Sequence, residues 1–176
     1  MNSNEYVHEL GLDWNLEYIR ALTLKQQYSF VEGLPRHHRR VKDDLYLSYL
    51  QSRYPCLSDV WNVYTFHPTV GVEPHVDGGR KCSLNIPVKN CQDSATIFYK
   101  QQSDYTYNYK EDIILTAISG TLEETWRFTL TEPVLFNNTL PHSVEVWGAE
   151  PRIIFSWTVK DLTFDLAKAR FLDNQR

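Results

Sequence analysis

From Val60 onward, the chain is a succession of short apolar segments separated by turn-forming residues. In order, these segments are VWNVYTFH, CSLNIPV, ATIFYK, DIILTAI, RFTL, PVLFN, HSVEVW and PRIIFSWTV. The residues that form turns between them are Gly78-Gly79, Asn90, Asn108, Gly120, Asn137-Asn138 and Gly148. Short strands at such close spacing predict a β-sandwich, a barrel or a jelly roll.

The part of the chain before Val60 has a pattern that predicts helices instead. The segment DWNLEYIRAL offers Asp13 as an N-cap and places its apolar residues at helical intervals. A second helix is predicted in VKDDLYLSYLQSRY, where Pro55 ends it. The segment GLPRHHRR between them reads as a basic loop. Its neighbouring His37 and His38 would diverge on a helix or a strand, so we favour a solvated loop over a metal site.

A closing helix is predicted in FDLAKARFL near the end of the sequence. Because the sequence shows neither internal repeats nor a linker, we predict one domain over residues 1–176. Its fold class is α+β, mainly β. We expect a helical portion over residues 1–58, a jelly-roll core over 59–160 and a C-terminal helix over 161–176, with the N-terminal helices packed on the core.

Composition and charge exclude several classes of protein. A length of 176 residues is enough to bury a core, and a formal charge of −4 argues against nucleic-acid binding, because nucleic-acid-binding proteins usually carry a basic surface. Cys56, Cys82 and Cys91 are odd in number and lack CxxC spacing, so we expect reduced thiols. The N-terminus does not resemble a signal peptide, and no apolar stretch is long enough to cross a membrane. We therefore expect a soluble, cytoplasmic protein.

The segment PHVDGGR, residues 74–80, places a histidine and an aspartate two residues apart. On a strand, side chains at positions i and i+2 leave the same face, so His75 and Asp77 are expected to converge. The two glycines that follow release the chain from the strand and leave the space beside this point clear of side chains. This arrangement predicts half of a metal site.

The segment PHSVEVW supplies a further histidine at the start of a strand. Taken alone, His142 is more readily explained as a hydrogen-bonded core residue. Together with His75 and Asp77, however, it completes a set of two histidines and one carboxylate. That set is the facial triad of non-haem Fe(II) oxygenases, which leaves coordination positions open for other ligands.

An arginine ten residues further on stands in an otherwise apolar strand, PRIIFSWTV. Period-2 alternation places Ile153, Phe155 and Trp157 on a face that can pack outward against helices, and points Arg152 inward with Ser156. A buried arginine costs several kcal/mol unless an anion meets it. A bound dicarboxylate would do so with two parallel hydrogen bonds. The alternatives are pairing with an unidentified acidic residue or exposure to solvent.

The order HxD, then a distant histidine, then arginine resembles the iron(II)- and 2-oxoglutarate-dependent oxygenase superfamily. The resemblance rests on HVD, PHSVEV and PRIIFSW and extends from Val60 to Val159. It implies a double-stranded β-helix core in which His75, Asp77 and His142 hold Fe(II) and Arg152 binds the distal carboxylate of 2-oxoglutarate.

Three further residues are candidates for the same cavity by this resemblance. Members of the superfamily often carry a tyrosine on the strand before HxD, and Tyr64 matches that position, although it could equally be a core residue. Many members carry serine two residues after the arginine, where this chain has Ile154; Ser156 is the nearest equivalent. Asn85 either lines the cavity or pairs locally within its strand.

The resemblance implies that dioxygen is consumed and that succinate and CO2 are released. An intact Asp77 favours hydroxylation over halogenation, because halogenating relatives replace this carboxylate. The core loosely resembles prolyl and aspartyl/asparaginyl hydroxylase-like members, so the substrate is either a small molecule or a protein or peptide side chain. Arg80, Lys81 and the RHHRR segment either attract an anionic substrate or are solvated surface residues, and we favour the second interpretation. The alternatives are a cupin-like metal-binding or zinc hydrolase domain, or a non-catalytic jelly-roll binding module.

Overall fold

The computed structural model describes residues 4–25, 36–40, 44–68, 71–102, 106–110 and 115–173. Its helices are α1 (Leu16–Leu24), α2 (Leu45–Arg53) and α3 (Phe164–Asp173). Its strands are β1 (Val7–Glu9), β2 (Arg36–Arg40), β3 (Leu57–Phe66), β4 (Val72–Asp77), β5 (Cys82–Lys89), β6 (Ser94–Tyr99), β7 (Thr106–Lys110), β8 (Leu115–Ser119), β9 (Glu124–Phe128), β10 (Val134–Asn137), β11 (His142–Val146) and β12 (Arg152–Val159).

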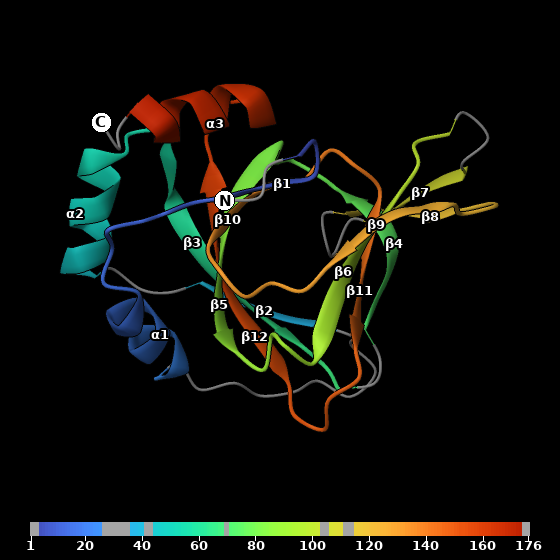
Figure 1. The fold of residues 1–176 in the computed structure, drawn as a ribbon, viewed down its shortest axis with the longest axis horizontal. Coiled ribbons are helices and arrows are strands. Elements are labelled where there is room, and N and C mark those ends of the chain that lie inside the picture. Colours follow the sequence, from blue (N-terminus) through green and yellow to red (C-terminus); the bar gives the residue numbers. More distant parts are fainter. Residues whose placement is uncertain are drawn as a thin grey trace.

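The strands form two sheets that face each other as the walls of a jelly roll (Figure 1). One sheet has the order β1-β10-β5-β12-β3-β2 and the other β7-β8-β4-β11-β6-β9. Neighbouring strands in both sheets run antiparallel, and many are far apart in the sequence, as with β3 and β12. The mainly β, double-stranded β-helix fold predicted from the sequence is therefore confirmed.

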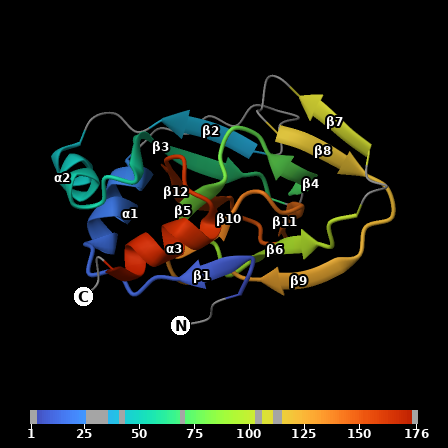
Figure 2. The same cartoon turned by 90° about the horizontal axis from the view of Figure 1, so that it is seen from above.

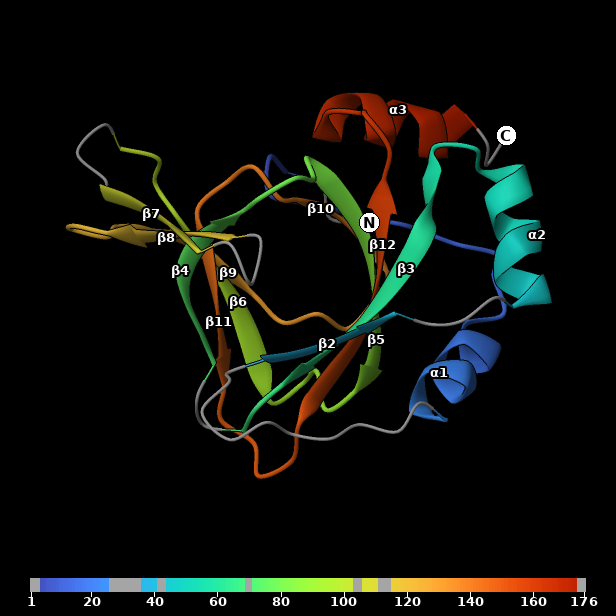
Figure 3. The ribbon, with the colours of Figure 1, turned by 180° about the vertical axis from the view of Figure 1, so that it is seen from behind.

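The helices cover the outer face of the first sheet, as Figures 2 and 3 show. Ile153, Phe155 and Trp157 of β12 pack in one buried cluster with apolar residues of all three helices. The outward packing predicted for this face of β12 is thus confirmed. Because this sheet is covered on both faces, its strands β5 and β12 are buried almost throughout, and a polar residue on their inner face needs a specific partner.

The ends of the helices differ in detail from the prediction. Helix α1 is capped by Asn15, whose side-chain oxygen accepts from the Tyr18 amide, so the predicted cap at Asp13 is wrong by two residues. Asp44 caps α2 and also accepts a hydrogen bond from the Tyr18 hydroxyl at 2.8 Å. The closing helix predicted within residues 161–176 is present as α3.

The region predicted as helical, residues 1–58, also contains two short edge strands. Strand β1 pairs with β10, and β2 pairs with β3 over the whole RHHRR segment, which the sequence predicts as a loop. Neither strand shows an alternation of apolar and polar residues. Both form by pairing with the open backbone hydrogen-bonding groups at the two edges of the first sheet, which does not require such a pattern. Strand β7 was not predicted either, and part of the segment predicted as the strand DIILTAI, residues 112–114, lies outside the described residues.

The cysteines are free, as the sequence predicts: Cys82 and Cys91 are buried and Cys56 is half-buried. Burial raises the pKa of the Cys82 thiol to about 12, so the reactive thiolate is scarce at neutral pH. Among the described residues, no helix has the length and apolar character that a membrane crossing requires.

His8 on β1 is buried, and neither of its ring nitrogens has a hydrogen-bond partner within the part of the chain that the structure describes. It lies opposite Leu135 on the outer face of the first sheet. Burial lowers the pKa of His8 below 6.5, and nearby Lys168 of α3 lowers it further, while Glu9 partly opposes this shift. The free energy of unfolding should therefore be fully retained above about pH 6.5 and fall as the pH drops through the lowered pKa, because the unfolded chain binds the proton more readily.

We accordingly expect acidification from pH 7.5 to 5.5 to lower the urea midpoint of the wild-type protein more than that of His8→Leu. The comparison uses metal-free protein, so that both variants carry the same contribution from every other histidine. An equal fall in the two midpoints would show that His8 does not contribute to acid sensitivity.

Candidate metal centre

The two histidines predicted as metal ligands lie directly opposite each other in the second sheet. Strands β4 and β11 are neighbours in a register that pairs His75 with His142. Directly opposite residues share a face, and Asp77 lies on the same face of β4 two residues further on. The segments PHVDGGR and PHSVEVW, which are far apart in the sequence, are thus neighbours in the fold. One ligand atom from each of the three residues lies within 4.8 Å of the others.

The orientation of each imidazole ring is set by a backbone carbonyl. The Nδ1–H of His75 donates to the carbonyl oxygen of Glu73 at 2.7 Å, and that of His142 to the carbonyl oxygen of Leu140 at 2.8 Å. In both rings the proton is thereby held on Nδ1, which leaves the lone pair of Nε2 as an acceptor. These Nε2 atoms lie 3.7 and 3.9 Å from the carboxylate oxygens of Asp77.

The carboxylate of Asp77 is buried and held by two donors. Its Oδ2 atom accepts hydrogen bonds from Arg80 at 2.9 Å and from the Asn138 amide at 2.5 Å. Burial alone would lower the pKa of Arg80, but Asp77 and the neighbouring Tyr64 outweigh this and raise it, so Arg80 stays charged. The prediction that Arg80 is a solvated surface residue is wrong, because the glycines before it let the chain turn back over the site.

The donor set fits a divalent transition-metal ion. Two imidazole nitrogens and one carboxylate are the facial triad of non-haem Fe(II) sites, and the carbonyl contacts at Nδ1 are the outer hydrogen bonds that fix metal-binding histidines. Ligand atoms about 2.1 Å from one ion lie about 3 Å apart in adjacent positions. Because the observed Nε2-to-carboxylate distances are slightly longer, small side-chain rotations would close the site.

Arg152 lies in the same cavity and has no acidic partner among the described residues. Its side chain is 3% exposed, and its guanidinium lies over the ring of Phe66 with 5.0 Å between its central carbon and the ring centre. Two of its nitrogens contact the Thr96 hydroxyl at 3.5 Å each, a weak interaction, and its Nε atom has no hydrogen-bond partner in the described segments. Burial lowers its pKa, and the nearby Cys91 thiol opposes this only in part.

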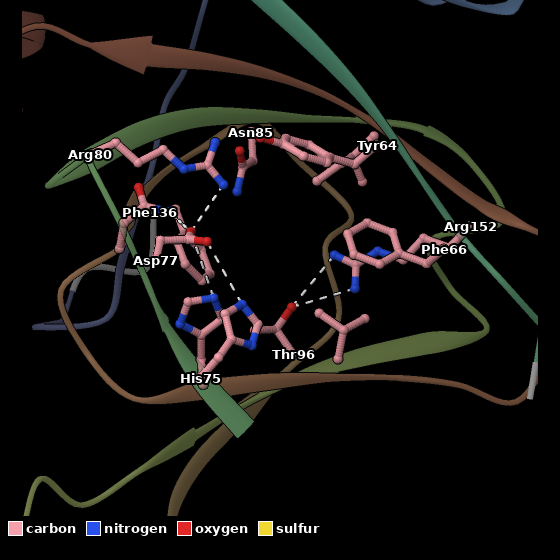
Figure 4. Close-up of a pocket in the computed structure, with 13 residues that line it drawn as sticks. Tyr64, Phe66, His75, Asp77, Arg80, Asn85, Thr96, Phe136 and Arg152 are labelled. Atoms are coloured by element: carbon pink, nitrogen blue, oxygen red, sulfur yellow. Dashed lines mark hydrogen bonds and ion pairs between the residues drawn. The ribbon is translucent and has the colours of Figure 1, made fainter. Parts of the chain in front are cut away.

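The cavity between these groups has about 410 Å³ of empty volume, including space that opens to solvent. Figure 4 shows His75 and Asp77 on one side, Arg152 beside Thr96 on another, and open space between them. Its lining combines apolar and aromatic side chains with several polar and charged groups, which can fix the orientation of a small ligand. A ligand that reaches from the histidines to Arg152 would need an acidic group at its far end.

The structure places the other predicted site residues around the same cavity. Tyr64 and Asn85 line its wall (Figure 4). Ser156 lies behind that wall, where its hydroxyl donates to Asn85 at 2.7 Å and accepts from Arg80 at 3.2 Å. Asn85 therefore has a local partner and also lines the cavity.

Sequence reasoning missed Thr96, Asn138 and the role of Arg80. Thr96 lies in a strand whose alternation gives its inward direction, but nothing in ATIFYK indicates contact with Arg152. Asn138 follows β10 and reads as a turn residue, which it also is. The side chains of His37 and His38 lie outside the described part of the structure, so the expectation for them stays untested.

Comparison with known proteins supports the fold. No protein-family model and no curated protein sequence matches the chain. The structure of Escherichia coli ycfD is similar with a TM-score of 0.54 and 11% identity, over 96% of this chain and 54% of that one. A cupin superfamily protein from Desulfitobacterium hafniense has a TM-score of 0.41 and 10% identity, over 88% of this chain and 98% of that one. Oxalate decarboxylase from Bacillus subtilis has a TM-score of 0.41 and 12% identity, over 79% and 28%.

The chain thus spans about half of the ycfD structure and less than a third of the decarboxylase. At these identities the similarity concerns the jelly-roll fold alone. The similarity therefore carries no information about an oxygenase function.

Proposed function

We propose that this chain is an Fe(II)- and 2-oxoglutarate-dependent oxygenase that hydroxylates its substrate. The observation that carries the proposal is a buried arginine without an acidic partner in the described structure, facing the same cavity as a His-Asp-His cluster. A metal-binding site alone needs no such arginine. A cosubstrate with an acidic group at each end satisfies both features at once.

In this proposal the residues around the metal ion and around Arg152 each have a defined role. His75, Asp77 and His142 hold the metal ion through Nε2, a carboxylate oxygen and Nε2. Arg152 binds the distal carboxylate of 2-oxoglutarate, and the Thr96 hydroxyl beside it supplies a further donor. The Phe66 ring, stacked on the guanidinium, keeps water away from this charge pair and so strengthens it.

Tyr64 and Asn85 line the wall beside the cosubstrate and are the next candidates to contact it. Asn85 accepts hydrogen bonds on its side-chain oxygen from Ser156 and Ser83. Its amide nitrogen is therefore left to donate toward the cavity, where Figure 4 shows the side chain. Ser156 acts on the cosubstrate only through Asn85 and Arg80.

When bound, iron(II) would supply the activation of dioxygen, while 2-oxoglutarate would be oxidised to succinate and CO2. One oxygen atom enters succinate and the other forms the new hydroxyl of the substrate, so the atoms of dioxygen are fully used. The protein supplies placement and a shielded cavity. The substrate is a small molecule or a protein or peptide side chain, and we propose a cytoplasmic location in keeping with the free thiols.

The alternatives explain less of the cavity. A zinc hydrolase or a cupin-like domain could use the same three ligands, but neither gives Arg152 a partner. A non-catalytic jelly-roll module would leave the convergence of His75, Asp77 and His142 without a purpose, at the cost of burying their polar groups.

The proposal predicts that purified protein converts 2-oxoglutarate into succinate slowly even without its substrate, provided that Fe(II) and air are present. Succinate is measured by mass spectrometry after incubation with ascorbate. An Asp77→Ala variant and a wild-type sample under nitrogen are the controls. If wild-type protein in air forms no more succinate than these controls, the proposed oxygenase activity is wrong.

A further inference from the structure

Arg80 is the second arginine in the cavity, and its contacts differ from those of Arg152. It lies in the turn between β4 and β5, and its side chain is only 14% exposed. One guanidinium nitrogen donates to Oδ2 of Asp77 at 2.9 Å and another to the Ser156 hydroxyl at 3.2 Å. Its central carbon lies 5.2 Å from the centre of the Tyr64 ring.

These contacts tie the guanidinium of Arg80 to the first sheet. Ser156 and Tyr64 belong to β12 and β3, which are paired neighbours there. The Ser156 hydroxyl is itself fixed, because it donates to Asn85 at 2.7 Å. Arg80 thus connects a residue of the second sheet, Asp77, to a rigid part of the first, and its own position has little freedom.

Asn138 supplies the second donor to the same oxygen of Asp77. Its amide lies 2.5 Å from Oδ2, and the side chain is buried. Its backbone N–H donates to the carbonyl oxygen of Lys81 at 3.1 Å, next to Arg80 in the turn. The two donors are therefore linked, and both approach Oδ2. The other carboxylate oxygen, Oδ1, lies 3.7 Å from Nε2 of His75, while Oδ2 lies 3.9 Å from Nε2 of His142.

We infer that Arg80 and Asn138 are positioning residues that hold Oδ2 of Asp77, so that the carboxylate offers only Oδ1 to the metal ion. A carboxylate can bind a metal through one oxygen or through both. Occupying Oδ2 with two donors keeps a coordination position free that a two-oxygen carboxylate would fill. This inference rests on the proposed metal site and specifies how that site keeps its open positions.

The test counts the water molecules on Mn(II) bound to the protein without 2-oxoglutarate, using the relaxation of water protons. Three single-atom protein ligands leave about three positions for water in an octahedral site. We expect about three waters in the wild type and about two in Arg80→Met, where Asp77 can turn and bind through both oxygens. Arg80→Lys keeps a charged donor and should restore the wild-type count.

Arg152→Met is the matched control, because it removes an equal charge from the same cavity without touching Asp77. It should keep about three waters. The affinity for Mn(II) is a poorer readout for Arg80→Met, because the substitution has two opposite effects on it. Removing the positive charge of Arg80 favours Mn(II) binding, whereas removing its hydrogen bond to Asp77 weakens Mn(II) binding. The water count is free of this ambiguity.

Each result decides between the possibilities. A wild-type protein that binds no Mn(II) contradicts the proposed metal site itself. A wild-type protein that binds Mn(II) with about two waters shows that Asp77 already uses both oxygens, which overturns the inference alone. An unchanged count in folded Arg80→Met also overturns it. If Arg80→Met does not fold, as a thermal melt would show, Asn138→Ala takes its place and should likewise lose water.

Discussion

Replacing Arg152 by leucine should remove the binding of 2-oxoglutarate while leaving the jelly roll folded. Arg152 is 3% exposed, and its polar partners in the described structure are only the weakly placed Thr96 hydroxyl and the Cys91 thiol. Losing one member of a desolvated charge pair costs about 2–5 kcal/mol of binding free energy. Because each 1.4 kcal/mol is about tenfold, the dissociation constant should rise about 30-fold or more. The measurement is isothermal titration of 2-oxoglutarate into Mn(II)-loaded protein under nitrogen.

The stability of the same variant separates a binding role from a structural one. Replacing a buried charge by an apolar side chain of similar volume is often neutral or stabilising. Arg152→Leu should therefore melt at the wild-type temperature or above it in the absence of ligand. Unfolding of this variant would show that Arg152 supports the fold, and unchanged binding in a folded variant would show that the distal carboxylate lies elsewhere.

Removing a ligand of the predicted triad should have the largest effect on metal binding. Wild-type protein should retain Fe(II) or Mn(II) in a 1:1 ratio after desalting under nitrogen, whereas Asp77→Ala and His142→Ala should retain almost none. Loss of an outer partner costs about 10–100-fold in metal affinity, and loss of a direct ligand should cost more. The metal content is measured by inductively coupled plasma mass spectrometry.

Two residues outside the cavity provide matched controls for these losses. His67 follows β3, where its Nδ1–H donates to the carbonyl oxygen of Pro68, and Asp59 accepts a hydrogen bond from Lys160 on the surface. His67→Ala and Asp59→Ala should keep the full metal content. Retention of the metal by both triad variants would exclude the triad, and loss of metal in the controls would point to a general defect in folding.

Much of the fold and the convergence of His75, Asp77 and His142 could be predicted from local patterns in the sequence. Period-2 alternation located most of the core strands, and it gave the inward direction of Arg152 and the outward packing of Phe155 correctly. The i, i+2 spacing of His75 and Asp77 placed both on one face of β4. These predictions succeed because the direction of a side chain on a strand depends only on its position in the chain.

The features that were missed depend on pairing between distant segments. Strands β1 and β2 form because the edges of the first sheet offer unpaired backbone groups. The composition of RHHRR therefore does not predict that this segment is a strand. Arg80 turns inward because Asp77, Ser156 and Tyr64 surround it in three dimensions. Asn138 and Thr96 gain their roles in the same way, so only the structure reveals them.

The central claim is that the cavity binds a metal ion and, against Arg152, the distal carboxylate of a 2-oxo dicarboxylate. The most direct test titrates two ligands into Mn(II)-loaded protein under nitrogen: 2-oxoglutarate, and 2-oxopentanoate, which has the same chain length but lacks the distal carboxylate. Wild-type protein should prefer 2-oxoglutarate by about 30-fold or more, the effect of one desolvated charge pair, and Arg152→Leu should abolish this preference. Equal affinity of wild-type protein for the two ligands, or no binding of 2-oxoglutarate, would contradict the claim.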